Sequence, residues 1–370
     1  MAEEEPIIVD LSGIKKTNTP LKLSDFAESI SYIQLDENPL LGDMEMATVH
    51  VVNDTIYIDR ENIYKYTSEG EFIGRVFIEG PGPGEARKFV YYHAALNRDK
   101  RYFTFMNGGK FTFVSFSFEG EYLGEEAVID SLERRIYTYF NNSLLFEYPM
   151  NGLYEIGDKV NMLGPYLLYA KDADTGEIVY KYPNPAADEL AVKGKSTLER
   201  PQGDMLFVNS GEQLWFKHKN IDTIYQTIDL EKIVPKYIIK PHKSFMNIHR
   251  YTHYKVMDMT KSEAMSTDAI SGFIPLPSGG FVYGLNYGIG VVNPSGKASD
   301  WYDKAIVNDL DDYLDSIDLL NKFYHGAFTV NNGSLYFTID AYLFFEEGSC
   351  PPFPSLTEDS NPVVVKIKLK

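Results

Sequence analysis

Short runs rich in β-branched and aromatic residues, separated by polar turns, recur along the chain and are typical of β-strands. Residues 49–52 and 55–58 form two such runs, and Asn53-Asp54 between them fits a tight hairpin turn. The runs at 62–66 and 71–76 follow after further polar turns. These four closely spaced strands predict an antiparallel meander.

The same unit returns along the sequence. Residues 117–124 copy residues 67–74 at a spacing of 50 residues, and looser copies of the turn occur at 174–178 and 293–297. Residues 331–340 open a last copy. Four strands repeated every 40–60 residues or so are typical of a β-propeller, and 370 residues divided by six gives about 62 for each unit. We therefore predict an all-β fold, a single six-bladed β-propeller domain.

The two ends of the chain predict how the ring closes. The C-terminal run at 362–369 leaves the last blade, with 326–340, short of four strands. We expect one or both of the N-terminal runs, 7–11 and 30–35, to share that blade, because pairing hides unpaired strand edges. Truncation at either end should then open the ring. The approximate blades are residues 46–80, 88–127, 134–183, 204–241, 270–303 and 326–369, with an N-terminal strand from 7–36.

Three segments depart from the strand pattern. Residues 308–320 place apolar side chains at helical spacing, which predicts a short amphipathic helix with an acidic outer face. Residues 244–267 carry few strand signals and predict a helix or a long excursion. Residues 344–362 are rich in proline and predict a loop between two strands of the last blade.

Charge and composition exclude several classes of protein. The 53 acidic and 35 basic side chains give a formal charge of -18, which repels phosphate backbones and anionic lipid and so disfavours nucleic-acid or peripheral-membrane binding. The single cysteine, Cys350, cannot close an intrachain disulfide, so packing alone must hold the fold. No apolar run is long enough for a transmembrane segment. We expect a monomer.

The motifs that resemble catalytic or ligand-binding sites are better explained as turns and connections of the fold. Residues 80–84 are rich in glycine and proline but lack the Gly-Lys-Ser/Thr of a phosphate loop, and they predict a crossover between blades. His249 and His253 have metal-ligand spacing without the glutamate of a zinc-protease helix. Residues 172–177 depart from the calcium-loop pattern and predict a hairpin turn. With no nucleophile elbow either, we expect no catalytic residue, metal or cofactor.

Propeller geometry predicts where a ligand would bind. The turn between the second and third strands of each blade lies on the same face as the crossover from the previous blade, around one mouth of the central channel. Amide and aromatic side chains there suit sugar rings and suit peptides nearly as well. The predicted ligand-binding residues are Arg60, Asn62, Arg87, Asn107, Tyr148, His218, Asn286, Tyr287, Asp340 and Tyr342.

A family resemblance adds to this interpretation. Residues 70–74, leading into Glu-Gly-Pro-Gly-Pro-Gly-Glu at 79–85, resemble the linker of NHL-type propellers. Over nearly its whole length the chain resembles the six-bladed β-propeller lipoproteins of anaerobic gut bacteria, whose function is largely unknown. In later blades the linker is degenerate or absent. Further stretches that carry the resemblance are 21–26 with 33–35, 222–225, 234–238, and 340–342 with 361–364.

The resemblance implies export to the periplasm or cell surface, often with a lipidated N-terminus. The lipid-bearing cysteine would lie upstream of Met1, so that the sequence is a trimmed mature form.

Three hypotheses follow for the function. The first is an exported, non-catalytic binding or scaffolding propeller whose ligand is a glycan or a protein partner. The second is a hydrolase or lyase acting on a polysaccharide or peptide at the same face; a metal ion, or two carboxylates about 5–10 Å apart, would favour it. The third is a surface assembly component that uses the loop at 344–362, for which we expect an exposed apolar patch.

Overall fold

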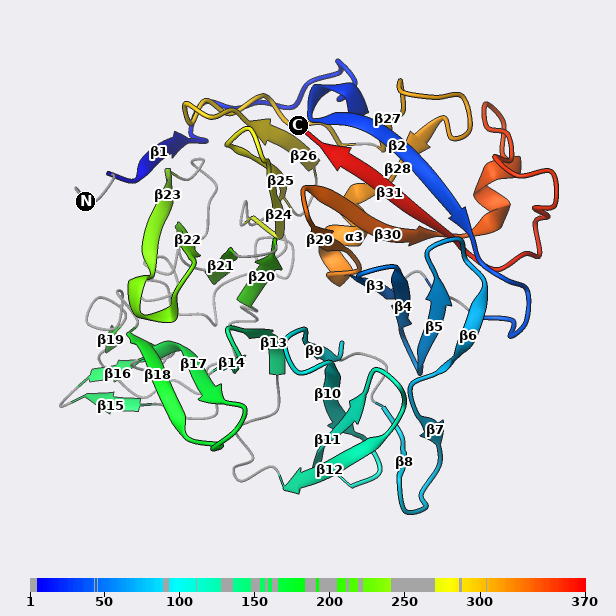
Figure 1. Ribbon diagram of the computed structural model, residues 1–370. Helices are drawn as coiled ribbons and strands as arrows, with labels where there is room; N and C mark the ends of the chain where they lie inside the picture. Colours follow the sequence, from blue (N-terminus) through cyan, green and yellow to red (C-terminus); the bar gives the residue numbers. More distant parts are fainter. Residues whose placement is uncertain are drawn as a thin grey trace.

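Six blades stand around a central axis in the computed structural model (Figure 1). The fold is an all-β propeller, as the repeat pattern predicted. The structure describes residues 5–370 apart from 43, 45, 89–92, 111, 128–135, 148–153, 157–158, 162–165, 184–190, 193–204, 211–212, 219–221, 241–269, 286–287 and 304.

The first three blades follow one another along the chain, and in each the innermost strand comes first. Their hairpin turns use residues that tolerate positive φ, such as Asn53 at φ 52° between β3 and β4. The strands of the first blade are β3 (Thr48–Val52), β4 (Thr55–Asp59), β5 (Ile63–Thr67) and β6 (Phe72–Arg75). Those of the second are β9 (Ala95–Asn97), β10 (Tyr102–Asn107), β11 (Thr112–Ser117) and β12 (Tyr122–Ala127). Those of the third are β13 (Ile136–Phe140), β14 (Ser143–Glu147), β17 (Tyr166–Asp172) and β18 (Ile178–Pro183).

The last three blades involve the N-terminal segment as well. The fourth blade comprises β20 (Met205–Asn209), β21 (Leu214–His218), β22 (Thr223–Thr227) and β23 (Val234–Lys240), with β1 (Ile7–Asp10) at its outer edge. The fifth comprises β24 (Gly272–Pro275), β25 (Phe281–Leu285) and β26 (Gly288–Val292). The sixth comprises β29 (Thr329–Asn331), β30 (Ser334–Ile339), β31 (Val363–Leu369) and β2 (Ala27–Gln34).

Shorter elements connect the blades. A parallel pair, β7 (Ile78–Glu79) and β8 (Glu85–Ala86), flanks the glycine- and proline-rich stretch, which therefore lies in the predicted crossover between the first two blades. The remaining elements are β15 (Tyr154–Ile156), β16 (Lys159–Asn161) and β19 (Ala191–Val192), the pair β27 (Ile306–Val307) and β28 (Ser316–Ile317), the helix α3 (Leu319–His325), and the 3-10 turns η1 (Leu23–Asp25), η2 (Leu230–Lys232) and η4 (Ala341–Phe345).

The N-terminal segment closes the ring. Strand β2 pairs antiparallel with the C-terminal β31, so the two ends share the sixth blade, as predicted (Figure 1). Strand β1 instead pairs in parallel with β23 of the fourth blade. Between them, Lys16 and Lys22 form parallel bridges with Trp301 and Val307. One N-terminal strand thus completes the last blade, and the other strengthens a blade two positions away.

The helix predicted at 308–320 is wrong in position. Residues 308–318 form turns and the short strand β28, and α3 begins only at Leu319. The side chain of Asn308 accepts a hydrogen bond from the amide of Leu310, and that of Asp311 accepts one from Tyr313. Such local side-chain bonds compete with helical backbone bonds, so the apolar spacing alone was misleading.

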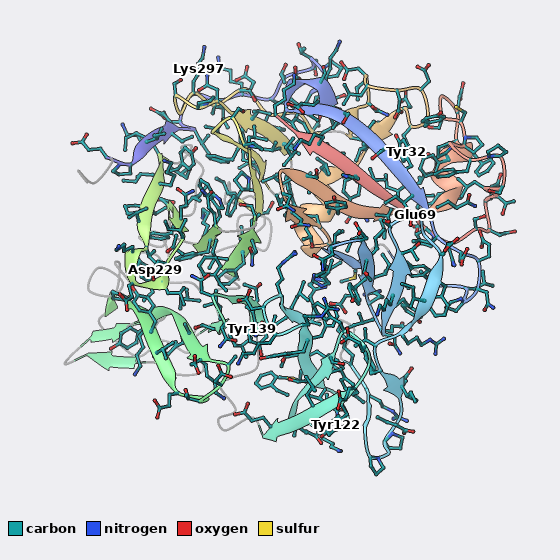
Figure 2. The ribbon with its side chains drawn as sticks, viewed as in Figure 1. Tyr32, Glu69, Tyr122, Tyr139, Asp229 and Lys297 are labelled. Carbon is teal, nitrogen blue, oxygen red and sulfur yellow. The ribbon has the colours of Figure 1, made fainter. Side chains whose placement is uncertain are left out.

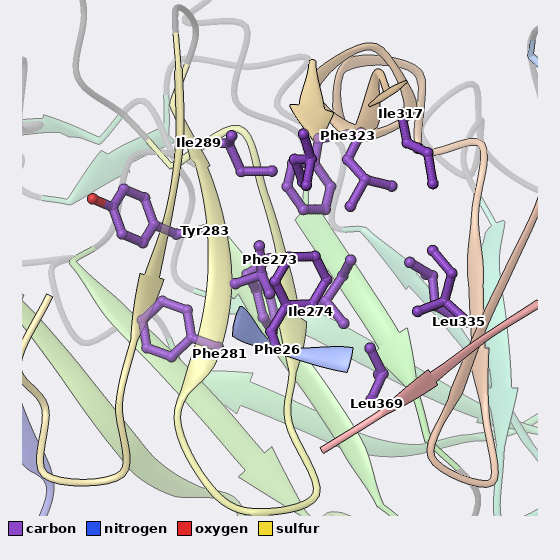
Figure 3. Packing of buried hydrophobic residues seen from close by; sticks show 14 of the residues in the cluster. Phe26, Phe273, Ile274, Phe281, Tyr283, Ile289, Ile317, Phe323, Leu335 and Leu369 are labelled. Atoms are coloured by element: carbon purple, nitrogen blue, oxygen red, sulfur yellow. The ribbon is translucent and has the colours of Figure 1, made fainter. Parts of the chain in front are cut away.

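The core is a series of clusters between neighbouring blades, and the largest joins the N-terminal segment to the last three blades (Figure 3). Helix α3 caps it by laying Phe323 over two paired glycines, Gly272 and Gly284. A Cβ atom at either glycine would lie 2.6 Å or 2.4 Å from that ring. The absence of side chains at this pair is therefore what lets the helix approach the sheet.

The loop between β30 and β31 is partly anchored. Phe344 and Leu356 are buried, whereas Tyr342 and Phe345 are half exposed or nearly so. The excursion expected at 244–267, with His249 and His253, lies outside the described residues. The stretch at 172–177 is a turn, in which Asp172 accepts hydrogen bonds from the amides of Asp174 and Thr175.

Candidate functional site

The crossover into the second blade meets the turns of two blades on one face of the ring, which we call the crossover face. Lys88 forms an antiparallel bridge with Asn107 at the end of β10. Its Nζ also donates a hydrogen bond of 2.8 Å to the carbonyl of Arg60, in the turn between β4 and β5. The crossover therefore fastens the first blade to the second at this face.

A buried polar group lies beneath this junction, and we call it the Asp59 cluster: Thr48, His50, Asp59, Lys88 and His93. Thr48 and Asp59 are direct cross-strand partners of β3 and β4, and His50 follows Thr48 by two positions. Because side chains alternate along a strand, all three project from the same face of the first blade. Lys88 and His93 approach that face from the crossover.

The carboxylate of Asp59 is fully buried and has several polar neighbours. Lys88 Nζ lies 2.9 Å from one of its oxygens, and the amide of Ala94 donates to the other at 2.6 Å. His50 Nε2 lies 3.6 Å from that second oxygen. Separately, His93 Nδ1 and Thr48 Oγ1 form a hydrogen bond of 2.7 Å. The cluster thus joins a buried ion pair to two imidazole rings.

These contacts keep Asp59 ionised. Burial by itself would raise the pKa of this carboxyl, but the Lys88 ammonium, with His50 and His93, more than offsets burial and holds the pKa below its ordinary value of 3.8. A buried ion pair is tolerated when its geometry and hydrogen bonds compensate the loss of water. A strongly perturbed carboxylate beside two histidines also marks a candidate functional site.

The ring nitrogen His50 Nε2 has unused hydrogen-bonding capacity. Within the described part of the chain, His50 Nε2 has no hydrogen-bond partner, since its distance to Asp59 is too long for one. The ring packs edge-on against Phe103 of the second blade, with 5.8 Å between the ring centroids. A small ligand group that reached this nitrogen could donate to it or accept from it.

Four of the residues predicted for ligand binding surround the Asp59 cluster. Asn62 and Asn107 are buried, and their side chains bond the backbone: Asn62 accepts from its neighbour Ile63, and Asn107 accepts from the amide of Arg87. Arg60 is also nearly buried, whereas Arg87 is exposed. The two amides therefore shape the turns, and of the four only the Arg87 side chain is exposed on the crossover face.

The other predicted residues lie apart from this group or outside the part of the chain that the structure describes. Asp340 precedes η4 and Tyr342 lies within it, on the orange-red turn at the outer side of the sixth blade (Figure 1). His218 ends β21, but its side chain is outside the described part, as are Tyr148, Asn286 and Tyr287 entirely. A ligand-binding role for the ten residues stays a prediction.

The Asp59 cluster is not evident from the sequence. Its only visible signal was the alternation that puts Thr48, His50 and Asp59 on one face of a predicted hairpin. That Lys88 and His93 would reach this face from the next blade depends on the path of the crossover, which no local pattern encodes. Predicting the cluster therefore requires knowing which residues of the crossover contact the first blade.

Neither a metal site nor a membrane span is found among the described residues. In that part of the chain, no group of three or more His, Cys, Asp or Glu side chains is arranged to hold a metal ion. No helix there is long and apolar enough to cross a membrane.

Comparisons with known proteins extend over nearly the whole chain. The family model described as a domain of unknown function, DUF4934, matches residues 6–368. The crystal structure of a Bacteroides fragilis protein predicted to be exported is similar, with a TM-score of 0.63 and 14% identity over 98% of this chain and 99% of that one. A DUF4221 family member from Bacteroides vulgatus has a TM-score of 0.53 and 12% identity, over 96% and 99% of the two chains. No curated protein matches in sequence.

Proposed function

Because the chain belongs to the DUF4934 family, whose description gives no activity, we propose a function from its own residues. The protein is a non-catalytic binding or scaffolding propeller that binds a glycan or a protein partner on the crossover face, at the mouth of the channel. We also propose that it is exported as a periplasmic or cell-surface lipoprotein. The Bacteroides fragilis protein of the same fold, itself predicted to be exported, supports export.

The observation that carries the binding proposal is the Asp59 cluster. A fully buried carboxylate and ammonium are costly to desolvate, so their presence under a surface turn favours a role beyond packing. Lys88 binds the carbonyl of Arg60 and so fixes the turn between β4 and β5. The exposed Arg87 precedes Lys88 in the crossover and is held close to that turn. A rigid turn loses less conformational entropy when a ligand binds.

A binding screen tests this proposal. Glycan arrays and thermal-shift assays of the wild-type chain should yield a ligand, and Arg87→Ala should weaken its binding by about tenfold, the effect of losing one good polar contact. Arg75→Ala, on the outer strand of the first blade, is the matched control, since its arginine is equally exposed. A screen in which every ligand found is bound equally well by wild type and Arg87→Ala would reject the crossover face.

Catalysis is a second candidate, which the position of His50 favours. His50 Nε2 lies 3.6 Å from a carboxylate that stays ionised, and a histidine so placed can serve as a general base in hydrolysis or lysis. Incubation with polysaccharide and peptide libraries would detect new reducing ends or cleaved bonds. Product that disappears in His50→Gln, with binding retained, would replace the binding function with an enzymatic one.

A further inference from the structure

A cleft opens between the second and third blades, away from the Asp59 cluster. Its volume is about 290 Å³, at the lower end of the range for small-molecule sites, so it has room for a single ring-sized ligand. Its walls come from β10, β11 and β12 on one side and from β13, β14 and β17 on the other. These two blades are neighbours in the ring (Figure 1).

The internal repeat explains why the cleft is open. Lys65 and Ser115 stand 50 residues apart at the same position of the unit, each opposite a glycine, Gly74 and Gly124, at a β-bulge. Lys65 reaches the next blade and donates a hydrogen bond of 3.2 Å to the carbonyl of Phe118. Ser115 is too short to do this. A side chain that bridges one interface is thus missing from the next.

The cross-strand partners of Lys65 and Ser115 also differ in size, and the smaller one again belongs to the second blade. Tyr57 is the cross-strand partner of Lys65, and Thr104 is the partner of Ser115. Tyr57 is buried against Phe103, with 5.0 Å between the ring centroids. The second blade therefore presents two small hydroxyl residues where the first presents a tyrosine and a lysine, and the lost volume becomes the cleft.

The inner wall of the cleft is aromatic and carries a row of hydroxyl groups. Thr104 Oγ1 lies 2.8 Å from Ser115 Oγ and 3.0 Å from the hydroxyl of Tyr139, which lies at the junction of the two blades (Figure 2). Tyr102 packs edge-on against Tyr139 with 5.4 Å between centroids. Burial raises the pKa of Tyr139, with a further contribution from Tyr102, so its hydroxyl keeps its proton.

The rim of the cleft is negatively charged. Glu125, Glu126 and Asp172 carry three carboxylates against two ammonium groups, that of Lys171 in the lining and that of Lys110 paired with Glu125, which leaves one negative formal charge. Lys171 Nζ lies 2.7 Å from Glu126 Oε1 and so links the two blades. Glu125 accepts hydrogen bonds from Lys110, Thr112 and Asn107 and is fixed in place. An anionic ligand would be repelled here.

We propose that this cleft is a binding site for one neutral pyranose, either free or at the end of an oligosaccharide. A pyranose has an apolar face that fits the tyrosine rings and hydroxyls that fit the Thr104–Ser115–Tyr139 row and the Glu125 carboxylate. The site lies between the second and third blades, whereas the crossover face joins the first and second, and the bond from Asn107 to Glu125 connects the two. The proposal for the cleft stands whether or not the binding function proposed for the crossover face is correct.

Titration with methyl glucopyranoside and methyl galactopyranoside, followed by ligand-observed NMR, tests the proposal. At least one of them should bind wild type, and glucuronate should bind at least tenfold more weakly. Protonated glucosamine tests for a cation site. Absence of binding by both glycosides, or tighter binding of glucuronate or glucosamine, would overturn the proposal.

Two variants link binding to the cleft. Ser115→Lys copies the residue of the first blade and should abolish binding, whereas the same change at the exposed Ser295 of the fifth blade should leave binding intact. Thr104→Val removes one hydroxyl at nearly constant shape and should weaken binding several-fold, which covers the case in which Ser115→Lys fails to fold. Arg87→Ala should have no effect. Unchanged binding in both cleft variants would disprove the assignment.

Discussion

The first and second blades meet through aromatic rings and a buried ion pair, whereas the second and third meet through hydroxyl groups around a cleft. In the first interface, Tyr57, Phe103 and Phe118 pack together with centroids 5.0–5.3 Å apart, and Lys65 bridges the blades. In the second, Thr104 and Ser115 take the equivalent positions. The first and second sheets pair these positions in the same way, so the contrast at these positions lies in the side chains.

This contrast shows how a repeat fold acquires sites. The first two blades pair these positions in the same register, and a change at one pair of positions decides whether the gap beside the blade is filled or open. Function can therefore differ between interfaces without any change in the architecture. The following predictions either remove this difference or measure it.

The largest effect is expected at the ion pair of the first interface. Lys88→Met removes a buried ammonium and leaves Asp59 ionised without its main partner, which should lower the free energy of unfolding by about 3–5 kcal/mol. Urea unfolding monitored by circular dichroism would measure the change. Lys171→Met, which breaks a pair with an exposed glutamate across the second interface, is the control and should cost at most about 1 kcal/mol. Equal losses in the two variants would contradict the contrast.

The second effect is a change in pH dependence. In wild type the pKa of Asp59 lies below 3.8, so its contribution to stability is complete above that pH and is lost as the pH falls toward the folded-state pKa. In Lys88→Met we expect burial to outweigh the two histidines and to raise the pKa of Asp59 above 3.8, so that acidification protonates Asp59 and relieves the destabilisation.

The difference in unfolding free energy between wild type and Lys88→Met should therefore shrink on going from pH 7 to pH 4. The change is about 1.4 kcal/mol for each unit by which the pKa rises. Unfolding curves at several pH values would measure it, and the contacts of Asp59 with His50 and His93 are common to both proteins. A difference that stays constant or grows with acidification would show that Lys88 does not set the ionisation of Asp59.

The smallest effect is expected at the position that distinguishes the two interfaces. Lys65→Ser gives the first interface the residue of the second and removes the hydrogen bond to Phe118, at a cost of about 1 kcal/mol. Chemical denaturation would register it as a shift of the midpoint. We expect Lys65→Ser to create no pyranoside site at the first interface, because Tyr57 still fills the space between the blades. A cost near zero would mean that Lys65 does not hold the blades together.

The sequence predicted most of the fold because the fold is repeated. The copy of residues 67–74 at 117–124 was enough to indicate blades, and the unpaired C-terminal strand indicated where the ring closes. The prediction of a helix at 308–320 was wrong because the side chains of Asn308 and Asp311 accept hydrogen bonds from backbone amides two residues ahead, which apolar spacing does not reveal.

The site was less predictable than the fold. Arg60, Asn62, Arg87 and Asn107 do meet on one face, since turn and crossover positions follow from strand order. Strand order does not reveal which of these side chains are available to a ligand. The side chains of Asn62 and Asn107 are hydrogen-bonded to the backbone, and the ionised group beneath them is Asp59. Lys65 and Ser115 lie just before the aligned copies at 67–74 and 117–124, and the meaning of their difference required knowing that both side chains face a neighbouring blade.

The path of the N-terminal segment has a consequence for how the chain folds. Ala27 is made early and its partner Leu369 is 369 − 27 = 342 positions later, so the pairing of β2 with β31 forms only after Leu369 has been made. Closing so long a loop is slow relative to local hairpins, which the earlier blades can form independently. Until then the inner faces of the first and last blades are uncovered and exposed to misassociation, and the rate of this final step should limit the yield of native protein.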